Sequence, residues 1–468
     1  MLQYDLVLKN GLVIDPINHI HDRRDIGIID GKIAAVEKEL TYTKEIIDVN
    51  GKVVMPGIID MHAHVGRRFG FGGYRMIAET GVTTTIDLAG PIDEITEDLS
   101  HYGCGLNIGV LEAMIPGHKG ISSVNPSESE IKYFLESSLE RGAIGLKLFG
   151  GHSPLTPEAT EAGMSIANQL RVMVAYHAGT TATKSDMTGM REAVELAKGK
   201  QLLLAHINAY MRGNVAHPME ELKEGLALLK DNKNIFSDSH LAVMNATKGS
   251  CTNGIPDDYV TRVCLNLYEY PVTEKGLEDA IASGIVSVMK QVGGKTILIS
   301  GEEALREWHE KQTHTSISFP VNLPTVATGC SVEKDRPGGD FIIEMASTDG
   351  GGIPRNNLIK RMLSFYHLGY LSLEEVVIKI SVNPARIFGF TQKGHLSIGA
   401  DADITVVDLE RSQASMSFVH GKVNMIEGVV LGKGGTLYVT DAGVKAAKKA
   451  HLSYGIIDFN HSLFYKRT

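Results

Sequence analysis

The stretch Pro56-Gly57-Ile58-Ile59-Asp60-Met61-His62-Ala63-His64 is an apolar, strand-like run that ends in two histidines, two residues apart. Residues i and i+2 of a β-strand point to the same side, so His62 and His64 project together and can bind one metal ion through their imidazole nitrogens. Two core histidines without a ligand would leave buried polar nitrogens unsatisfied. The pattern therefore favours a metal site at the carboxyl end of this strand.

Seven further apolar runs follow, and stretches with helical character, such as residues 129–141 and 157–169, separate them. Repeated strand–helix units predict a parallel sheet covered by helices. Eight such strands favour an α/β fold of the (β/α)8 TIM-like barrel type, with a doubly wound open sheet as the alternative. The predicted strands are residues 58–65, 83–88, 106–112, 144–149, 172–177, 202–207, 234–240 and 341–349.

Short strands and turn dipeptides mark both ends of the chain. Residues 1–55 contain Asn10-Gly11, Asp30-Gly31 and Asn50-Gly51 between apolar runs, which predicts antiparallel hairpins. The segment 394–408, GHLSIGADADITVVD, returns to this pattern. We therefore expect residues 1–55 and 390–440 to form one small β-sandwich module, and residues 441–468 to form a C-terminal extension with a helix over 441–454.

The barrel is expected to span residues 56–389 and to carry a large insertion. Its seventh and eighth strands lie about 100 residues apart, whereas a βα loop commonly has about 2 to 6 residues. Residues 241–340 are therefore interpreted as an insertion. Within it, the sequence predicts a helix over 274–292 and a strand over 296–300.

Composition excludes several classes of protein. The chain has 468 residues with 46 Lys+Arg and 55 Asp+Glu, a net charge of −9, so nucleic acid is not an expected ligand. No apolar run approaches the roughly 20 residues of a membrane span, and the N-terminus lacks the features of a signal peptide. The four cysteines have no CxxC spacing, which favours a reducing compartment and a cytoplasmic location.

The motif of residues 56–64 resembles the first-strand signature of the amidohydrolase superfamily, Pro-Gly-x-x-Asp-x-His-x-His. The resemblance extends over roughly residues 4 to 410 and includes Ser381-Val382-Asn383-Pro384-Ala385-Arg386 after the barrel. Within the superfamily, the chain is most similar to the branch of hydantoinases, dihydropyrimidinases and dihydroorotases. This resemblance implies a metal-dependent hydrolase that acts on a small molecule and, as is common in that branch, forms a homo-oligomer.

The resemblance also implies a set of metal ligands at strand ends. His62, His64 and Asp349 would hold one divalent ion, and His177 and His206 a second. Lys147 would be carboxylated and bridge the two ions, since an ammonium group would be repelled by them. Zinc is the leading candidate, beside manganese, iron, cobalt and nickel. Asp349 has two rivals for its position, Asp238 and Asp340.

The activity implied is hydrolysis of a C–N bond in a cyclic amide or ureide, with a metal-bridging hydroxide attacking the carbonyl and Asp349 as general base. The alternatives are hydrolysis of an N-acyl amino acid or dipeptide, mononuclear deamination of a ring, and a non-catalytic scaffold. Glycines at 150–151 and 350–352 permit close backbone approach to a ligand. The residues expected to contact substrate are Arg67, His152, Asn208, Tyr210 and His240.

Overall fold

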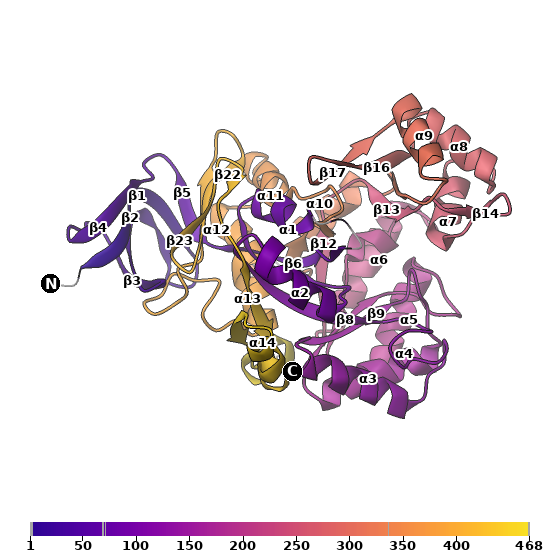
Figure 1. The fold of residues 1–468 in the computed structure, drawn as a ribbon, viewed down its shortest axis with the longest axis horizontal. Coiled ribbons are helices and arrows are strands. Elements are labelled where there is room, and N and C mark those ends of the chain that lie inside the picture. Colours follow the sequence, from indigo (N-terminus) through magenta and orange to yellow (C-terminus); the bar gives the residue numbers. More distant parts are fainter. Residues whose placement is uncertain (1–2, 68–69, 71, 336, 467–468) are drawn as a thin grey trace.

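Eight parallel strand positions form a barrel at the centre of the computed structural model, which describes residues 3–67, 70, 72–335 and 337–466 (Figure 1). The eighth position is split: β19 (Met345–Ser347) pairs with β12 and β20 (Gly350–Gly351) pairs with β6, so this one segment closes the ring. The (β/α)8 prediction is confirmed. The other strands are β6 (Ile58–His64), β7 (Val82–Asp87), β8 (Leu106–Met114), β9 (Gly145–Phe149), β10 (Met173–His177), β11 (Leu202–Leu204) and β12 (Ile235–His240).

Helices cover the outside of the barrel. The capping box of Ser127 and Glu130 starts α3, whose buried face carries Ile131, Phe134 and Leu135 at helical spacing. Buried faces of this kind attach the helices to the sheet. The helices are α1 (Gly73–Ala78), α2 (Ile92–Tyr102), α3 (Glu128–Glu140), α4 (Pro157–Gln169), α5 (Met187–Ala197), α6 (Pro218–Asp231), α11 (Leu358–His367), α12 (Leu373–Val377), a π-helical turn (Ile378–Val382) and α13 (Asn383–Phe388).

The two ends of the chain share one nine-stranded sheet, at the left of Figure 1. The connection is the antiparallel pairing of β5 with β21. Hydrogen bonding along the sheet is continuous, and a single hydrophobic cluster includes Ile33 of β3 and Phe418 of β22, so the expected sandwich is one curled sheet. Its strands are β1 (Tyr4–Asp15), β2 (Ile20–Ile29), β3 (Lys32–Glu37), β4 (Thr43–Asp48), β5 (Val53–Pro56), β21 (Ile404–Asp408), β22 (Gln413–Val419), β23 (Lys422–Ile426) and β24 (Val429–Val430).

Two of the three turn dipeptides do not form the predicted hairpins. Strand β1 continues through Asn10-Gly11, where Asn10 has a φ of 64° and the register with β2 shifts, so this pair is a bulge. Asn50-Gly51 joins β4 to β5, and both of these strands run parallel to β1, end to end. Asp30-Gly31 does join an antiparallel hairpin, β2 to β3.

The insertion forms a lobe of its own, at the upper right of Figure 1, around the buried Trp308. The helix expected over 274–292 ends at Ala282, because residues 287–292 are instead a strand paired with β17 and β18. The strand expected over 296–300 is present as β17. The elements of the lobe are β13 (Asn245–Lys248), β14 (Cys251–Thr252), β15 (Ile255–Pro256), α7 (Tyr259–Leu267), α8 (Glu274–Ala282), β16 (Ser287–Val292), β17 (Lys295–Ile299), α9 (Gly301–Glu310) and β18 (Ser316–Phe319). The last helix of the insertion, α10 (Pro324–Val332), packs on the barrel instead, where Val326 and Cys330 join its core.

The C-terminal segment returns to the barrel. Strand β25 (Gly435–Val439) pairs in parallel with β8 and with β26 (Ser453–Ile456). The helix expected over 441–454 is shorter, α14 (Val444–Lys449), and follows a 3-10 turn (Asp441–Gly443). A second 3-10 turn (Phe459–His461) and α15 (Leu463–Lys466) end the described chain. Among the described residues, no helix is both long and apolar enough to cross a bilayer.

Candidate metal centre

The predicted ligands lie at the carboxyl ends of the barrel strands. His62 and His64 end β6, and His177 ends β10. His206 directly follows β11, and Asp349 lies between β19 and β20. Four strand ends thus deliver five histidine and aspartate side chains to one region, while Lys147 comes from within β9.

Asp349 makes close contact with both histidines of the first motif. Its Oδ1 lies 2.8 Å from His64 Nε2 and 3.3 Å from His62 Nε2. Among the described residues, one cluster of metal-ligating side chains consists of His62, His206 and Asp349, whose ligand atoms lie within 4.8 Å of one another. An oxygen and two imidazole nitrogens at this spacing are a suitable donor set for a divalent ion.

His177 and His206 form the other half of the centre. His206 Nε2 lies 3.0 Å from His177 Nδ1, and the ring of His206 stacks on that of His62 with centroids 5.2 Å apart. Burial lowers the pKa of both His177 and His206 well below the ordinary value, and Lys147 adds to this effect while Asp349 opposes it. Both rings are therefore neutral at physiological pH, which is the form of histidine that binds metal.

Lys147 is fully buried at this centre. Its Nζ has no hydrogen-bond partner among the residues that the structure describes. Burial lowers the pKa of Lys147 to about 8, although the charges of Asp238 and Asp349 act in the opposite direction. A buried amine with no partner is costly, and a lowered pKa increases the neutral fraction that can react with carbon dioxide. These properties fit a bridging, carboxylated lysine.

Two of the candidate ligands have a left-handed backbone. The φ angles of His206 and Asp349 are 39° and 50°, a region that residues other than glycine seldom adopt and that concentrates at functional sites. Gly351 (φ 82°) follows, and a Cβ there would lie 2.3 Å from the carbonyl oxygen of His64. A Cβ at Gly151 would lie 1.9 Å from Nε2 of His177. Both glycines thus make room for candidate ligand residues of the protein itself.

Asp238, one of the two alternatives to Asp349 as a ligand, contacts two of the candidate metal ligands, His62 and His206. Its Oδ2 lies 3.4 Å from His62 Nδ1, and its Oδ1 accepts a 2.8 Å hydrogen bond from the backbone N–H of His206. Burial would raise the pKa of Asp238, but the charge of His62 and the hydrogen bonds outweigh it and lower the pKa. A carboxylate on the second ring nitrogen fixes the tautomer of a metal-binding histidine. Asp340, the other rival, is exposed and lies before β19.

Asp60 holds the backbone next to Asp349. Its carboxylate accepts hydrogen bonds from the hydroxyl and the N–H of Thr348. It also accepts one from the N–H of His62, which lies two residues further along the same motif. Burial raises the pKa of Asp60 to about 6, against the effect of these hydrogen bonds. The aspartate of the sequence motif therefore ties β6 to the segment that closes the barrel.

Arg355 is a residue of the centre that the sequence analysis missed. Its Nη2 pairs with Asp349 Oδ2, and its Nε donates a 2.6 Å hydrogen bond to the Asp349 carbonyl. Its Nη1 donates to the carbonyl of Met244, where the insertion begins. Burial would raise the pKa of Asp349, but Arg355, followed by His62 and His64, holds it well below the ordinary value. A single arginine in a loop offered no sequence signal for this contact.

The predicted substrate contacts fall into three groups. His152 lies beside the centre, with its ring centroid 5.3 Å from that of His177. His240 is also buried there, its ring 6.0 Å from that of His206, and burial lowers its pKa to about 3. Arg67, in contrast, faces α2 and pairs with Glu97 and Asp98, so the structure does not bring its guanidinium to the centre.

Tyr210 and Asn208 make internal hydrogen bonds beneath the centre. The Tyr210 hydroxyl donates to the Ala205 carbonyl at 2.8 Å and accepts from the Ala178 N–H at 2.9 Å. The side-chain oxygen of Asn208 accepts from the His240 N–H at 3.0 Å. These bonds connect the ends of β10, β11 and β12, so in this structure both side chains position strand ends.

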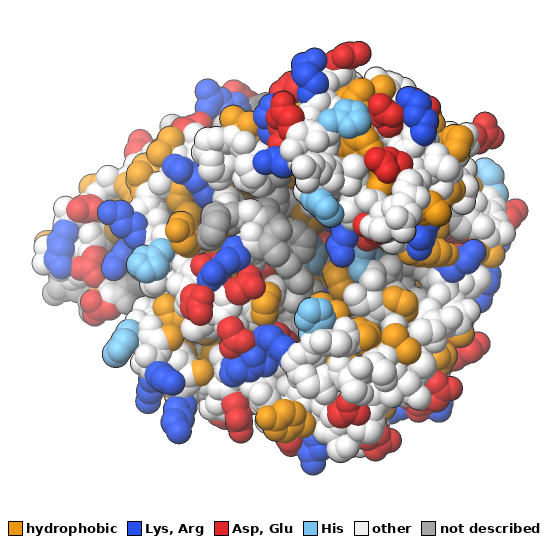
Figure 2. Space-filling model, turned by 45° about the vertical axis from the view of Figure 1, so that its right-hand side comes forward, with side chains coloured by type: hydrophobic (Ala, Val, Ile, Leu, Met, Phe, Trp, Pro, Cys, Tyr) orange, Lys and Arg blue, Asp and Glu red, His pale blue; other side chains and the backbone are white. Residues whose placement is uncertain are grey.

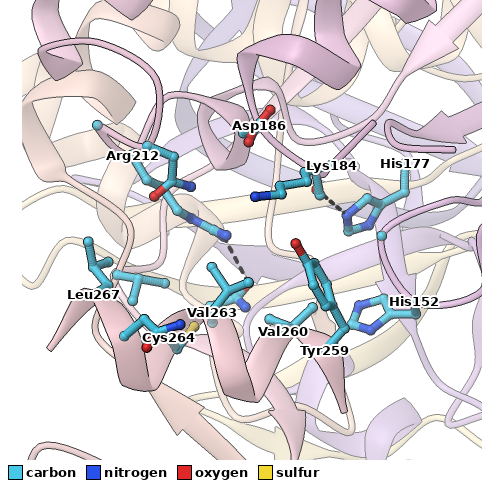
Figure 3. Close-up of a pocket in the computed structure, with 17 residues that line it drawn as sticks. His152, His177, Lys184, Asp186, Arg212, Tyr259, Val260, Val263, Cys264 and Leu267 are labelled. Carbon is cyan, nitrogen blue, oxygen red and sulfur yellow. Dashed lines mark hydrogen bonds between the residues drawn. The ribbon is translucent and has the colours of Figure 1, made fainter. Parts of the chain in front are cut away.

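A cavity of about 410 Å³ opens beside His177 (Figure 3). Barrel loops contribute His152, Lys184 and Arg212, and the opposite wall is helix α7 of the insertion. The space-filling view shows the molecule hollowed between the insertion above and the barrel below, with histidine side chains at the edge (Figure 2). The cavity gives a small molecule access to His177, the candidate ligand among its lining residues.

Comparison with known proteins places the chain among hydrolases with this architecture. A family model described as "Amidohydrolase family" matches residues 339–434. The dihydroorotase of Pelotomaculum thermopropionicum is 24% identical over 87% of this chain and 90% of that protein. The allantoinase of Deinococcus radiodurans is 25% identical over 87% of each. The N-acyl-D-glutamate deacylase of Bordetella bronchiseptica, solved with zinc and a phosphonate inhibitor, has a TM-score of 0.66 at 16% identity, over 93% of this chain and 99% of that one.

Proposed function

This chain belongs to the amidohydrolase superfamily of hydrolases, and from that membership we propose that it hydrolyses a C–N bond in a cyclic amide or ureide. One observation carries the proposal: contacts link His62, His64, His177, His206 and Asp349 into one group. Lys147, whose charge acts on His177 and His206, is fully buried and has no hydrogen-bond partner in the described part of the chain. The curated relatives that align with most of the chain, a dihydroorotase and an allantoinase, have names that refer to cyclic substrates.

We assign two divalent ions to the centre. His62, His64 and Asp349 would hold one ion, and His177 and His206 the other, with carboxylated Lys147 between them. Zinc suits the mixture of imidazole and carboxylate donors. When bound, such ions polarise the carbonyl group of a substrate and lower the pKa of the attacking water.

The protein's own groups would then move the proton. Asp349 is the proposed general base, which takes a proton from the attacking water and passes it to the leaving nitrogen. Its Oδ1 faces His62 and His64, while its Oδ2 is held by Arg355. Arg355 is thus a positioning residue that keeps the carboxylate ionised and fixes its orientation.

Hydrolysis of an N-acyl amino acid is the second candidate. The wall of the cavity formed by α7 is apolar, with Val260, Val263 and Leu267, and suits an acyl chain. Ring deamination at one metal is less well supported, because it gives no role to Lys147. A non-catalytic scaffold would not need the full donor set.

The proposal also includes a location and an assembly state. All four cysteines are free, with Cys264 and Cys330 buried. We propose that the protein works in the cytoplasm and, in line with the resemblance described above, as a homo-oligomer. Size-exclusion chromatography with light scattering tests the assembly.

The test is a hydrolysis screen combined with metal analysis. The purified, metal-loaded protein is offered hydantoins, dihydropyrimidines, other cyclic ureides and N-acyl amino acids, and ring opening is scored separately from ammonia release. We expect ring opening and two metal equivalents per chain. Hydrolysis of N-acyl amino acids without ring opening would replace the first candidate with the second. Ammonia release with about one equivalent would overturn both.

A further inference from the structure

The insertion meets the barrel at Arg212, which follows β11 and lines the cavity opposite α7 (Figure 3). We propose that Arg212, oriented by the insertion, binds a carboxylate group of the substrate at the part of the molecule away from the scissile bond. This inference rests on the proposed function, since it concerns the cavity that His177 of the same centre lines. It also gives the insertion a role, since none of the proposed metal ligands comes from this part of the chain.

Two asparagines from the ends of the insertion fix the guanidinium. Asn322 Oδ1 accepts hydrogen bonds from Arg212 Nε at 2.9 Å and from Nη2 at 2.8 Å, and Asn245 Oδ1 accepts from Nη2 at 3.1 Å. Asn322 is itself held, because its Nδ2 donates to the Ala242 carbonyl at 3.1 Å and its N–H donates to the Val243 carbonyl at 3.0 Å. Arg212 is therefore oriented before any ligand arrives, which lowers the entropic cost of binding.

The three hydrogen bonds leave one end of the guanidinium for a ligand. An arginine has five N–H donors, and Asn245 and Asn322 take the donor on Nε and both donors on Nη2. No hydrogen bond from Nη1 to any described residue is present, and no carboxylate among those residues forms an ion pair with Arg212 within 4.0 Å. Amide oxygens orient a guanidinium but do not neutralise it, so the positive charge is available to an anion.

The charges around the cavity favour an anion as well. Lys184, an exposed lysine, also lines it and adds a second positive charge. Asp186 is the one acid among the described lining residues, and it is engaged as the N-cap of α5, where it accepts from the Thr188 N–H at 2.8 Å and hydroxyl at 2.6 Å.

The size and lining of the cavity define the class of ligand. A volume of about 410 Å³ accommodates a small molecule and not a polymer. Val260 and Val263 of α7 form an apolar side next to Arg212. The geometry points to a small amide or cyclic ureide with one carboxylate on a short substituent.

The experiment compares ligands that differ only in this group. The pair is a hydantoin with a carboxymethyl substituent and its carboxamide, and binding is measured by calorimetry on the metal-loaded full chain carrying Asp349→Asn, which prevents turnover. We expect the carboxylate to bind roughly 10- to 100-fold more tightly than the carboxamide. Adding Arg212→Met should reduce this ratio to within about twofold, while carboxamide binding stays the same. In the otherwise native enzyme, Arg212→Met should raise KM for the carboxylate substrate and leave kcat nearly constant.

Arg191→Met is the matched control. Arg191 pairs with Glu224 between α5 and α6 at the surface, so this variant removes the same charge but should keep the preference for the carboxylate. Arg212→Lys, which keeps the charge and loses the fork, should fall between wild type and Arg212→Met, and it replaces Arg212→Met if that variant does not fold. Equal binding of the two ligands by the protein with Arg212 intact, or no measurable binding of either, overturns the subsite.

The subsite and the proposed function fail in different ways. If the substrate screen finds no hydrolysis but carboxylate binding depends on Arg212, the subsite stands and the function falls. If hydrolysis occurs but Arg212→Met binds the carboxylate and the carboxamide with the same ratio of affinities as the protein with Arg212 intact, the proposed function stands and the subsite is wrong.

Discussion

Lys147 determines how many metal ions the centre can hold. It is buried among histidines and carboxylates, and its amine has no hydrogen-bond partner in the described part of the chain. Burial lowers its pKa to about 8, so the neutral amine is accessible near physiological pH. A purely structural lysine would be expected to have an acceptor, as Lys379 does in the Ile343 carbonyl at 2.7 Å.

Replacement of Lys147 by alanine removes the proposed bridge. We expect Lys147→Ala to abolish turnover and to lower bound metal to one equivalent or less, measured by elemental analysis of the purified protein. Added short carboxylic acids should restore part of the activity, because they can occupy the place of the carbamate. Lys379→Ala removes a different buried lysine and is the control for nonspecific damage. Full metal content and turnover in Lys147→Ala would contradict the binuclear arrangement.

The two buried aspartates should separate into two roles. Asp349→Asn keeps the size of the side chain and one oxygen, but it removes the negative charge and the basic lone pair that would accept the proton. Turnover should therefore collapse while the fold and much of the metal remain. Asp238→Asn weakens the support of His62, so metal affinity should fall by about 10- to 100-fold, and turnover should return at saturating metal. Metal titration with activity and circular dichroism readouts tests both. An inactive Asp238→Asn beside an active Asp349→Asn would exchange the assignments.

At this scale the sequence predicts ligands better than it predicts their supports. His62 and His64 share one strand at a spacing of two, so their common direction follows from strand geometry alone. Arg355 and Asp238 act through contacts to Asp349 and His62, and those contacts exist only after the barrel closes. Arg67 shows that proximity in sequence is not sufficient. It follows the motif closely in the chain, but its side chain pairs with carboxylates of α2 and not with the centre.

Among the elements, the insertion differs from its prediction in an instructive way. Residues 287–292 were expected to continue a helix, but they form β16 between two antiparallel partners. Pairing with β17 and β18 overrides the local helical pattern, and a local sequence pattern does not reveal which strands will pair. The same holds for Asn10-Gly11, a bulge within β1 because β2 pairs on both sides of it.

Unfolding of the insertion can be followed separately. Trp308 is the one tryptophan of the sequence, buried in the insertion with its Nε1 2.9 Å from the Gly249 carbonyl oxygen. The core around it is small compared with that of the barrel, so we expect this lobe to open first. Tryptophan fluorescence should then change at a lower urea concentration than far-ultraviolet circular dichroism. Trp308→Phe is the control for the signal. Coincident transitions would show that the lobe and the barrel unfold together.

In the whole molecule, the barrel and the terminal β-module share a buried ionic network. Lys393 Nζ lies 2.8 Å from Asp401 and also contacts Asp403, which accepts a 2.8 Å hydrogen bond from Asn107 of β8. Lys32 of β3 reaches Asp401 from the other side at 2.6 Å. The return of the C-terminal strands to the N-terminal sheet was predictable from their shared pattern of short strands. The network was not, because its members are far apart in the chain.

The network should make stability depend on pH. Burial would raise the pKa of Asp401, but the charge of Lys393 outweighs it and lowers the pKa to about 2. A carboxylate whose pKa is lowered by folding stabilises the protein above its ordinary value of 3.8, and this contribution is lost as the pH falls from there toward 2. The wild type should therefore keep this part of its stability throughout the neutral range.

Lys393→Met tests the network directly. The variant leaves the buried carboxylate of Asp403 without Lys393 and leaves Asp401 with Lys32 alone, which should lower the free energy of unfolding at pH 7 by about 3 to 5 kcal/mol. Loss of the Lys393 charge lets the pKa of Asp401 rise, so the deficit in the free energy of unfolding of the variant narrows as the pH falls toward 4. Urea denaturation at pH 7 and at pH 5 measures both effects. Lys44→Met, which removes an exposed partner of Asp5 in the same sheet, should leave stability unchanged. If Lys393→Met loses no unfolding free energy at pH 7, or loses more at pH 5 than at pH 7, the network does not join the module to the barrel in this way.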